Sequence, residues 1–305
     1  MQRYLLRRLL LAPLSLLLVS VVVFVILNVT GDPVVLYLGT EATPERIAEL
    51  RAQLGLDRPL VVQYGRFLAG ALRGDFGRSL RFDRPALDVV YLHLVPTAKL
   101  AAVGMGLAVA VGLLLGVAAA VRRGSWIDQT IGWFSVLGLS MPSFWLGIML
   151  IIFFAVRLRW LPTSGMESLR HYVLPSITLA TFLAPQFTLL VRASLLQVMH
   201  ELYVTTARAK GLWEARVFSH HVLRNALPTV IAFIGLQLGT VLGGAVVTET
   251  VFAWPGLGRL TVDAVSQRDV PVVEAAVVIL AVAVVVCNLA ADLANALVDP
   301  RIRYE

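Results

Sequence analysis

The chain has 305 residues, of which 58% are hydrophobic and 15% are charged, and its mean hydropathy is +0.80. Soluble domains are charged at about a quarter of their residues, so this composition excludes an ordinary soluble domain and indicates an all-α polytopic membrane protein. The net charge of +7 fits cytoplasmic loops that face anionic lipid, and the basic residues are too dispersed to predict a nucleic-acid partner. The single cysteine, Cys287, can form neither an internal disulfide nor a metal cluster.

Six apolar stretches are each long enough to cross the roughly 30 Å hydrocarbon core of a bilayer as a helix. In chain order they lie near residues 9–29, 98–121, 131–156, 173–195, 228–250 and 271–293. The first is longer than the apolar core of a typical signal peptide and no small-residue cleavage site follows it, so the sequence predicts a retained span. Pro175 and Pro185 interrupt the fourth stretch, which is tolerated where a cavity or neighbouring helices satisfy the backbone.

Arginine and lysine residues set the expected orientation, because short cytoplasmic loops carry an excess of both. They gather before the first predicted span, after the second, in the loop at 196–228 and at the C-terminus. This distribution predicts that both termini face the cytoplasm. The expected organisation is an N-terminal transmembrane helix at 1–30, an extracytoplasmic helical insert at 31–97, a core of five spans at 98–295 and a cytoplasmic tail at 296–305.

The insert at 31–97 carries the signals of two helices. Thr43 and Pro44 form a helix N-terminus, and Gly55 ends that helix. A second amphipathic stretch stops at Gly74. Its apolar side is expected to consist of Leu60, Val61, Tyr64, Phe67, Leu68 and Leu72. We expect a small helical cap, packed on the bundle or lying in the membrane interface, rather than a catalytic domain.

Motifs for catalysis and for metal binding are absent from the sequence. Both lysines, Lys99 and Lys210, follow alanine, so the Gly-Lys of an ATP-binding P-loop is missing. A zinc-protease signature begins at His200, but position 204, where the second histidine belongs, is Val204. No G-x-S-x-G nucleophile motif occurs. We therefore expect no catalytic residue, no metal site and no cofactor bound by this chain.

Carboxylates are scarce within the predicted spans, and three of them lie near span ends. Glu249 and Glu274 fall at the outer ends of the fifth and sixth spans, and Asp292 falls at the inner end of the sixth. Each is expected to reach an interface or to pair locally. This distribution argues against a secondary carrier driven by an ion gradient, so another component must supply the energy.

A basic, mildly amphipathic segment lies between the fourth and fifth predicted spans. Residues 203–210 and 212–220 can each form a short helix, with Gly211 as the break between them. Pairs expected to share a helix face are Tyr203 with Ala207 and Trp213 with Val217. Two short helices at an angle fit a groove on a soluble partner. The alternative, a basic loop held to anionic lipid, explains the charge but not the glycine-broken pair of helices.

This segment resembles the coupling loop of the inner-membrane permease subunits of ABC importers, in particular their dipeptide/oligopeptide branch. The loop of that family reads E-A-A-x3-G with a later I-x-L-P, and it docks in a groove of the ATPase subunit. Thr205, Thr206 and Ala207 occupy the first three positions here, and Gly211 occupies the glycine. The first two positions depart from the general consensus, whereas "HVLRNALP" at 221–228 follows the loop as in the peptide branch.

The resemblance covers nearly the whole chain. Segments similar to the branch are "GDP" at 31–33, "LGLDRPL" at 54–60, "GDFGRSL" at 74–80, "LSMPSFWLG" at 139–147, "LPTSG" at 161–165, "TETVFAWPGLGRL" at 248–260 and "DPRIRY" at 299–304. Each motif is weak alone, but seven in order around six spans are specific.

The resemblance implies a permease subunit in a bacterial inner membrane that shares a translocation path with a second permease, as a heterodimer. Two ATPase subunits would bind ATP and Mg²⁺, and an extracytoplasmic solute-binding protein would deliver di- or oligopeptides. Glutathione, nickel chelates and oligosaccharides are the alternative substrates of this branch, and an ion-coupled carrier is the alternative class. The coupling-loop residues that the resemblance assigns are Tyr203, Thr205, Thr206, Ala207, Arg208, Lys210, Gly211, Trp213, Glu214 and Arg216.

Polar side chains and helix breaks at membrane depth predict where the translocation path runs. The candidates are Ser140, Ser143, Gln186, Gln237 and Thr240. Glycines of the second span are interpreted as sites of close helix packing instead: Gly104, Gly106, Gly112 and Gly116. The outer loop 252–260 either meets the binding protein or forms a tight interfacial turn anchored by Trp254.

Overall fold

The computed structural model describes residues 2–29, 43–55, 57–79 and 81–298. Within these ranges every regular element is a helix, apart from one isolated β-bridge between Arg78 and Pro85, which agrees with the predicted all-α class. The predicted motifs at 31–33 and 299–304, and most of the predicted tail, lie outside the described residues. The chain separates into two compact units, which are described in turn.

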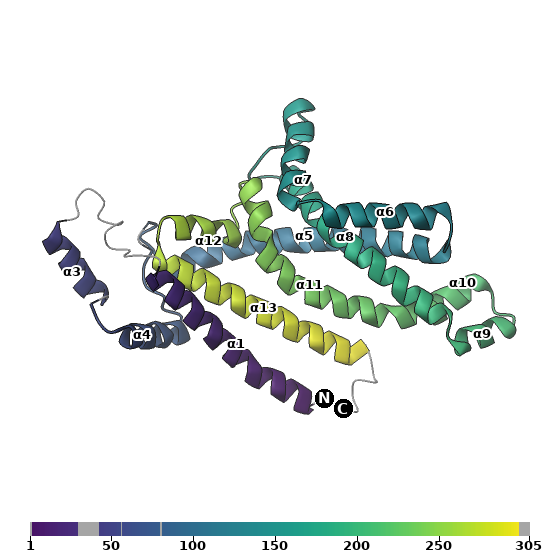
Figure 1. The fold of residues 1–305 in the computed structure, drawn as a ribbon, viewed down its shortest axis with the longest axis horizontal. Coiled ribbons are helices and arrows are strands. Elements are labelled where there is room, and N and C mark those ends of the chain that lie inside the picture. Colours follow the sequence, from purple (N-terminus) through teal and green to yellow (C-terminus); the bar gives the residue numbers. More distant parts are fainter. Residues whose placement is uncertain (1, 30–42, 56, 80, 299–305) are drawn as a thin grey trace. The chain divides into compact units, whose positions relative to one another are not determined.

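Unit 1 comprises residues 98–254 together with the C-terminal residues from 286 onward. Its helices are α5 (Ala86–Val121, from residue 98), α6 (Trp126–Ser140), α7 (Ser143–Leu150), the π-helix η2 (Ile151–Arg157), α8 (Leu169–Met199), α9 (Leu202–Ala209), α10 (Glu214–Arg216), the π-helix η3 (Val217–Leu223), α11 (Arg224–Val251) and the end of α13 (Val270–Val298). Figure 1 shows these elements in chain order.

Helix α8 is the central helix of unit 1, and α6, α7, α11 and η3 all pack against it. Helix α5 approaches it through glycines: a Cβ added at Gly104 would lie 3.0 Å from Leu179, and one at Gly116 would lie 2.7 Å from Val191. Gly112 is tighter still against Phe187. The predicted close packing is therefore confirmed at these three glycines and is wrong for Gly106, which faces open space.

The third predicted span, 131–156, is not one straight helix. Helices α6 and α7 meet at a bend of 99°, which makes them a broken span or a re-entrant pair. Met141, the residue before Pro142, has an extended ψ of 127°. A proline disfavours the helical conformation of the residue that precedes it, so Pro142 explains the break.

Four helical segments are long and apolar enough to cross a membrane, or five if the bent pair counts as one span. The four are Ala86–Val121, Leu169–Met199, Glu214–Gly243 and Val270–Ala291. The first predicted span lies in α1, where the described apolar stretch is Pro13–Ile26. The described residues thus support four or five of the six expected spans.

The fifth span starts earlier than its sequence suggests. Pro228, the expected first residue, lies inside α11, and the helix runs back through η3 and α10 to Glu214. A proline inside a helix leaves a carbonyl without its backbone donor, and wider π-turns accommodate such irregularities. The π-helix at 217–223 immediately precedes this site.

Unit 2 comprises residues 2–97 and 255–285. Its helices are α1 (Gln2–Val29), α3 (Pro44–Leu54), α4 (Leu60–Arg73), the first part of α5, α12 (Leu257–Ser266) and the first part of α13. Side chains from α5, α12 and α13, among them Val90, Leu257 and Val272, form its buried core.

The predicted helix ends in unit 2 are confirmed. The Thr43 hydroxyl accepts the Arg46 N–H at 3.4 Å, and α3 ends at Gly55 with φ +69°. Helix α4 ends at Gly74, whose φ is +76°.

The expected apolar face of α4 is only partly right. Tyr64 and Phe67 are half-buried in a cluster with Phe24 and Phe76. Leu68 is half-buried as well, whereas Leu60, Val61 and Leu72 are 57%, 82% and 83% exposed. Aromatic contacts with α1 and with the loop after α4 therefore decide which side of α4 is covered.

Candidate functional site

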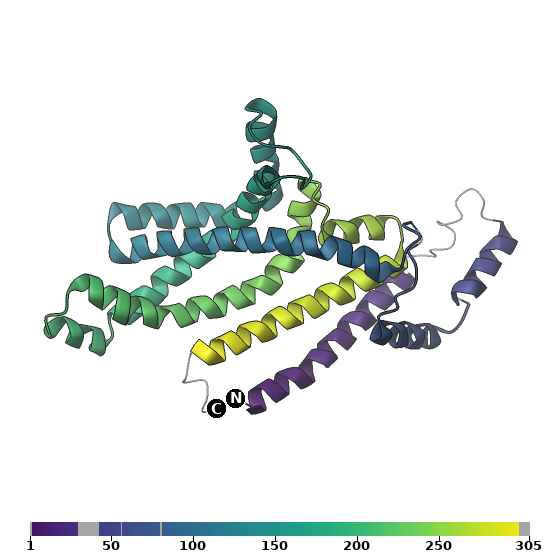
Figure 2. The ribbon, with the colours of Figure 1, turned by 180° about the vertical axis from the view of Figure 1, so that it is seen from behind.

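The segment between α8 and α11, residues 201–223, is the candidate coupling site and is called the elbow below. It contains α9, a turn at Gly211, α10 and the π-helix η3. Only His200 and Glu201 separate the end of α8 from the first residue of α9. Figures 1 and 2 both show α9 and α10 where α8 and α11 join, so the elbow connects these two long helices directly.

Gly211 makes the turn of the elbow. Its φ is +77°, in the left-handed region that favours glycine, and its N–H donates to the carbonyl of Arg208 at 2.9 Å. A Cβ added at Gly211 would meet nothing within 4 Å. The glycine is therefore required by backbone conformation and not by crowding, and the predicted helix break is confirmed.

The elbow has a small buried core of its own. Val204, Ala207, Val217 and Val222 are 0%, 6%, 0% and 0% exposed. In each pair expected to share a helix face, the smaller residue, Ala207 or Val217, is buried, whereas Tyr203 and Trp213 are exposed. Contacts of η3 with α9 and α8 turn these small side chains inward.

The outer side of the elbow combines exposed apolar and basic residues. Leu202 is 84% exposed, Tyr203 43% and Trp213 81%. The remaining predicted coupling residues on this side, Thr205, Thr206, Lys210 and Arg216, are exposed as well. These residues are called the elbow surface below. Large exposed apolar side chains beside cations are typical of a surface that another protein covers.

Arg208 and Glu214 form an ion pair across the Gly211 turn. Arg208 Nη2 lies 2.6 Å from Glu214 Oε1, and its Nε lies 3.1 Å from Oε2. The hydrogen bonds to Glu214 raise the pKa of the Arg208 guanidinium above its usual value. The pair joins α9 to α10 and so fixes the angle between them. The sequence assigned both residues to the loop but not to each other.

Two of the five predicted path residues are brought together. Gln237 of α11 donates from Nε2 to Oε1 of Gln186 on α8 at 2.9 Å. Ser140 and Ser143 flank the bend between α6 and α7. Thr240 is exposed, and its hydroxyl donates to the carbonyl of Leu236 within its own helix at 3.4 Å.

Comparison with known proteins identifies the family. Residues 112–304 match the family model described as binding-protein-dependent transport system inner membrane component, and residues 1–98 match the N-terminal model of such membrane components. The chain belongs to this family of ABC importer permeases. Its members are multi-pass inner-membrane subunits without an ATPase site, and partner subunits hydrolyse the ATP.

Two similar curated proteins are permeases of a glutathione transport system. The chain is 44% identical to the glutathione transport system permease protein GsiC of Salmonella paratyphi A and 43% identical to that of Escherichia coli K12. Each match spans 306 aligned residues and the whole of both chains. Among solved structures, the inward-facing MetNI methionine ABC transporter aligns with a TM-score of 0.58 at 20% identity, over 69% of this chain and 96% of the other. This likeness shows a shared fold.

The loop at 252–260 forms a tight turn at Trp254. This side chain is fully buried and packs edge-on against Tyr172, with ring centroids 4.7 Å apart, beside Leu100 and Leu179. Trp254 therefore anchors the turn in the protein core and not in the membrane interface, which is one of the two alternatives expected for this loop. Glu249 is also fully buried, so of the two alternatives expected for it, access to an interface is excluded and local pairing remains.

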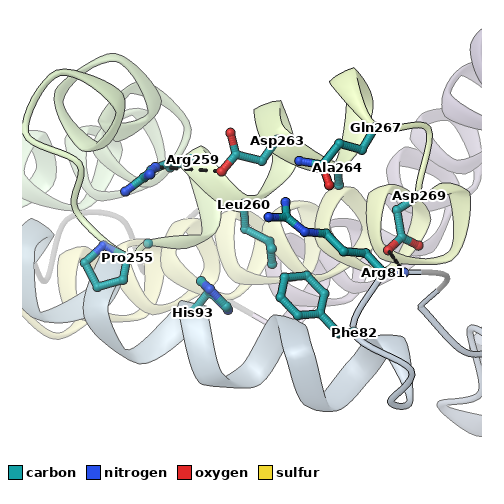
Figure 3. A pocket seen from close by; sticks show the side chains of 11 residues that line it. Arg81, Phe82, His93, Pro255, Arg259, Leu260, Asp263, Ala264, Gln267 and Asp269 are labelled. Atoms are coloured by element: carbon teal, nitrogen blue, oxygen red, sulfur yellow. Dashed lines mark hydrogen bonds and ion pairs between the residues drawn. The ribbon is translucent and has the colours of Figure 1, made fainter.

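Unit 2 of the permease contains a cavity of about 210 Å³ (Figure 3). Its lining comes from the loop after residue 80, from α5, from α12 and from the residues that flank α12, and includes Arg81, His93, Arg259, Asp263 and Asp269. Asp269 accepts a hydrogen bond from Ser79, and Asp263 lies 3.7 Å from Arg259. Arg81 lies over the ring of Phe82, 5.4 Å from its centroid. The lining thus combines the guanidinium groups of Arg81 and Arg259 with the carboxylates of Asp263 and Asp269.

The "GDFGRSL" motif shapes one wall of this cavity. Asp75 accepts the N–H of Gly77 at 2.9 Å, and Gly77 has φ +83°. These bonds turn the chain so that Ser79 reaches Asp269. Among the described residues no group of three or more metal-ligating side chains comes together.

Proposed function

We propose that this permease carries short peptides, glutathione among them, across the inner membrane through a path shared with a second, homologous permease. The names of the relatives at 43–44% identity support glutathione as the first solute to test. Glutathione is a tripeptide, so it falls within the peptide class that the sequence motifs suggest. Both termini and the elbow lie on the cytoplasmic side in this proposal.

The elbow is the part of the permease that couples it to the ATPase subunits. The observation that carries this assignment is the Gly211 turn, which presents Tyr203 and Trp213 outward on a segment joined directly to α8 and α11. A groove on an ATPase that accepts short amphipathic helices fits such a surface. When two ATPases close on ATP, the elbow would move with them and carry both helices.

The translocation path is proposed to run beside the amide pair of Gln186 and Gln237. Ser140, Ser143 and Thr240 are the other candidates. Polar side chains between two spans are costly in a lipid environment and usually line a cavity or join helices. The hydrogen bond between the two amides supports a polar strip between α8 and α11.

The solute-binding protein is proposed to meet the permease at residues 255–260 and at the cavity of unit 2. Pro255, Gly256 and Arg259 line this cavity, whereas the preceding Trp254 is buried. A carboxylate of the binding protein is the group that Arg81 and Arg259 suit.

Substitution of Gly211 tests the coupling function. The assembled importer with its ATPases and binding protein is placed in liposomes, and solute uptake and ATP hydrolysis are measured together. We expect Gly211→Val to lower the solute carried per ATP about tenfold or more, because a β-branched residue strongly disfavours positive φ. Gly211→Asn is the matched control, because asparagine tolerates this conformation. Coupled uptake by Gly211→Val at the wild-type ratio would refute the assignment.

The solute is tested separately. The binding protein encoded with the transporter is titrated with glutathione, a dipeptide and an oligosaccharide. Tightest binding of glutathione or a dipeptide supports the proposal, and preference for the oligosaccharide contradicts it.

A further inference from the structure

A second charged junction lies at the same end of unit 1 as the elbow. Figures 1 and 2 both place the end of α5 and the start of α6 at the end of unit 1 that carries α9 and α10. The connection between α5 and α6, residues 122–125, is called the α5–α6 turn. Gly124 in this turn has φ +76°, and Ser125 caps α6 by accepting the N–H of Asp128 at 3.4 Å.

Asp128 ties this turn to α8. Its Oδ1 accepts from Arg192 Nε at 2.6 Å and its Oδ2 accepts from Arg192 Nη2 at 2.8 Å. Oδ2 also accepts the N–H of Gly124 at 3.0 Å. The side chain of Asp128 is only 8% exposed and that of Arg192 is 34% exposed. A two-point bond between a planar guanidinium and a carboxylate fixes orientation as well as distance, so the junction resists twisting.

Two further links join the same parts. Arg123 Nη1 lies 3.1 Å from Nε2 of His200, the residue that caps α8. The guanidinium can only donate, so Nε2 of His200 accepts, and its Nδ1 donates to the carbonyl of Leu196 at 2.6 Å. Next to Arg192, Val191 packs against Gly116 of α5 so closely that an added Cβ would lie 2.7 Å away.

These links bear on the elbow because α8 leads straight into it. Arg192 stands seven residues before Met199, about 10 Å along the helix, and α9 begins three residues after Met199. A displacement of α9 therefore has to pass only His200 and Glu201 before it reaches α8, and from Met199 to Arg192 the helix is continuous. Arg192 is bonded to Asp128 at the start of α6, and Asp128 is also bonded to the backbone of the α5–α6 turn. A displacement of Arg192 therefore displaces both the turn and α6.

We propose that Asp128 is a positioning residue for transport: it makes α5 and α6 move with α8, so that a movement of the elbow is transmitted to four helices instead of two. This inference rests on the proposed coupling function of the elbow. Asp128 touches neither solute nor ATPase in this account. It acts through Arg192.

The first test removes and then restores the ion pair in the assembled importer in liposomes. We expect Asp128→Asn to lower solute uptake per ATP about tenfold while ATP hydrolysis continues, because Arg192 loses its partner. The exchanged double variant, Asp128→Arg with Arg192→Asp, is expected to regain at least about half of the ratio, as a pairwise interaction requires. Asp83→Asn is the matched control, since Asp83 forms an exposed ion pair with Arg78 at 3.2 Å.

An unchanged ratio of solute uptake to ATP hydrolysis in Asp128→Asn overturns the proposal. So does an exchanged variant that assembles but recovers nothing. Gly211→Val distinguishes a failure of the proposed role of Asp128 from a failure of the coupling function of the elbow. If that variant is uncoupled and Asp128→Asn is not, only the role of Asp128 falls, whereas unimpaired coupling in Gly211→Val removes the function on which it rests.

The second test leaves the ion pair of Asp128 intact and replaces the contact between Arg123 and His200 by a covalent link. Cysteines replace Arg123 and His200 in a Cys287→Ser background, and a short bismaleimide joins them. If α6 and α8 move together, cross-linked importer keeps its uptake per ATP within about twofold of the uncross-linked protein. Loss of uptake on cross-linking shows that the two parts must separate during transport and contradicts the proposal.

Discussion

The elbow surface and the junction at Asp128 lie at the same end of unit 1, but they are built in opposite ways. The elbow presents Trp213 at 81% exposure and is braced by an ion pair whose partners are 38% and 63% exposed. The junction buries its carboxylate, at 8% exposure, and sits beside glycines that hold α5 against α8. The difference separates a surface that has to accept a partner from a joint that has to transmit its movement.

The largest effect on stability is expected where the glycines beside the Asp128 junction pack α5 against α8. Gly112→Leu should destabilise unit 1 by about 3 kcal/mol, because its Cβ would collide with Phe187 in a close-packed contact. Leucine has a higher helix propensity than glycine, so any loss comes from packing. Thermal unfolding of the purified permease in detergent measures the change.

Gly106→Leu is the control for that substitution. Gly106 lies on the same helix and faces open space, so its variant should unfold at or above the wild-type temperature. Equal destabilisation by both variants would show that α5 does not pack on α8 through Gly112.

The next effect is expected at the elbow surface. Trp213→Ala should weaken the association of the ATPase subunits about tenfold, because exposed tryptophans often dominate the energy of an interface. The unfolding temperature of the permease alone should not change. Trp126→Ala is the matched control, because Trp126 is 74% exposed in unit 1 but lies outside the elbow. Equal effects on ATPase binding would remove Trp213 from the interface.

The smallest effect is expected at the ion pair between Arg208 and Glu214 in the elbow. Arg208→Gln should change stability by no more than about 1 kcal/mol, because exposed ion pairs contribute little. Uptake per ATP should fall about threefold if the angle between α9 and α10 matters for docking. Glu214→Gln should have the same effect, and the double variant should be no worse than either single variant. Additive losses would mean that the two residues act separately.

The features that sequence reasoning predicted are the ones with local causes. Gly211, Gly55 and Gly74 end helices because they adopt positive φ, which depends on the residue itself. Thr43 and Pro44 mark a helix start for equally local reasons. Motifs spread over the chain identified the family because each short motif can be matched to the family's own motif without knowledge of the fold.

The features that were missed depend on residues far apart in the sequence. Asp128 and Arg192 are 64 positions apart, and only the packing of α6 on α8 brings them together. The inward turn of Ala207 follows from η3 lying against α9. The 99° bend at Pro142 begins with a recognisable proline, but its size is set by the tertiary structure.

Placement of the elbow against the ATPase tests the account most directly. Trp213→Cys in a Cys287→Ser background is the only thiol of the permease, and a short photoactivatable maleimide attached to it can capture whatever lies next to it in the assembled importer. We predict a covalent product with the ATPase subunit, a much weaker one from Trp126→Cys, and no labelling of Trp213→Cys by a membrane-impermeant maleimide added outside intact cells. Labelling from outside, or no product with the ATPase, would contradict the account.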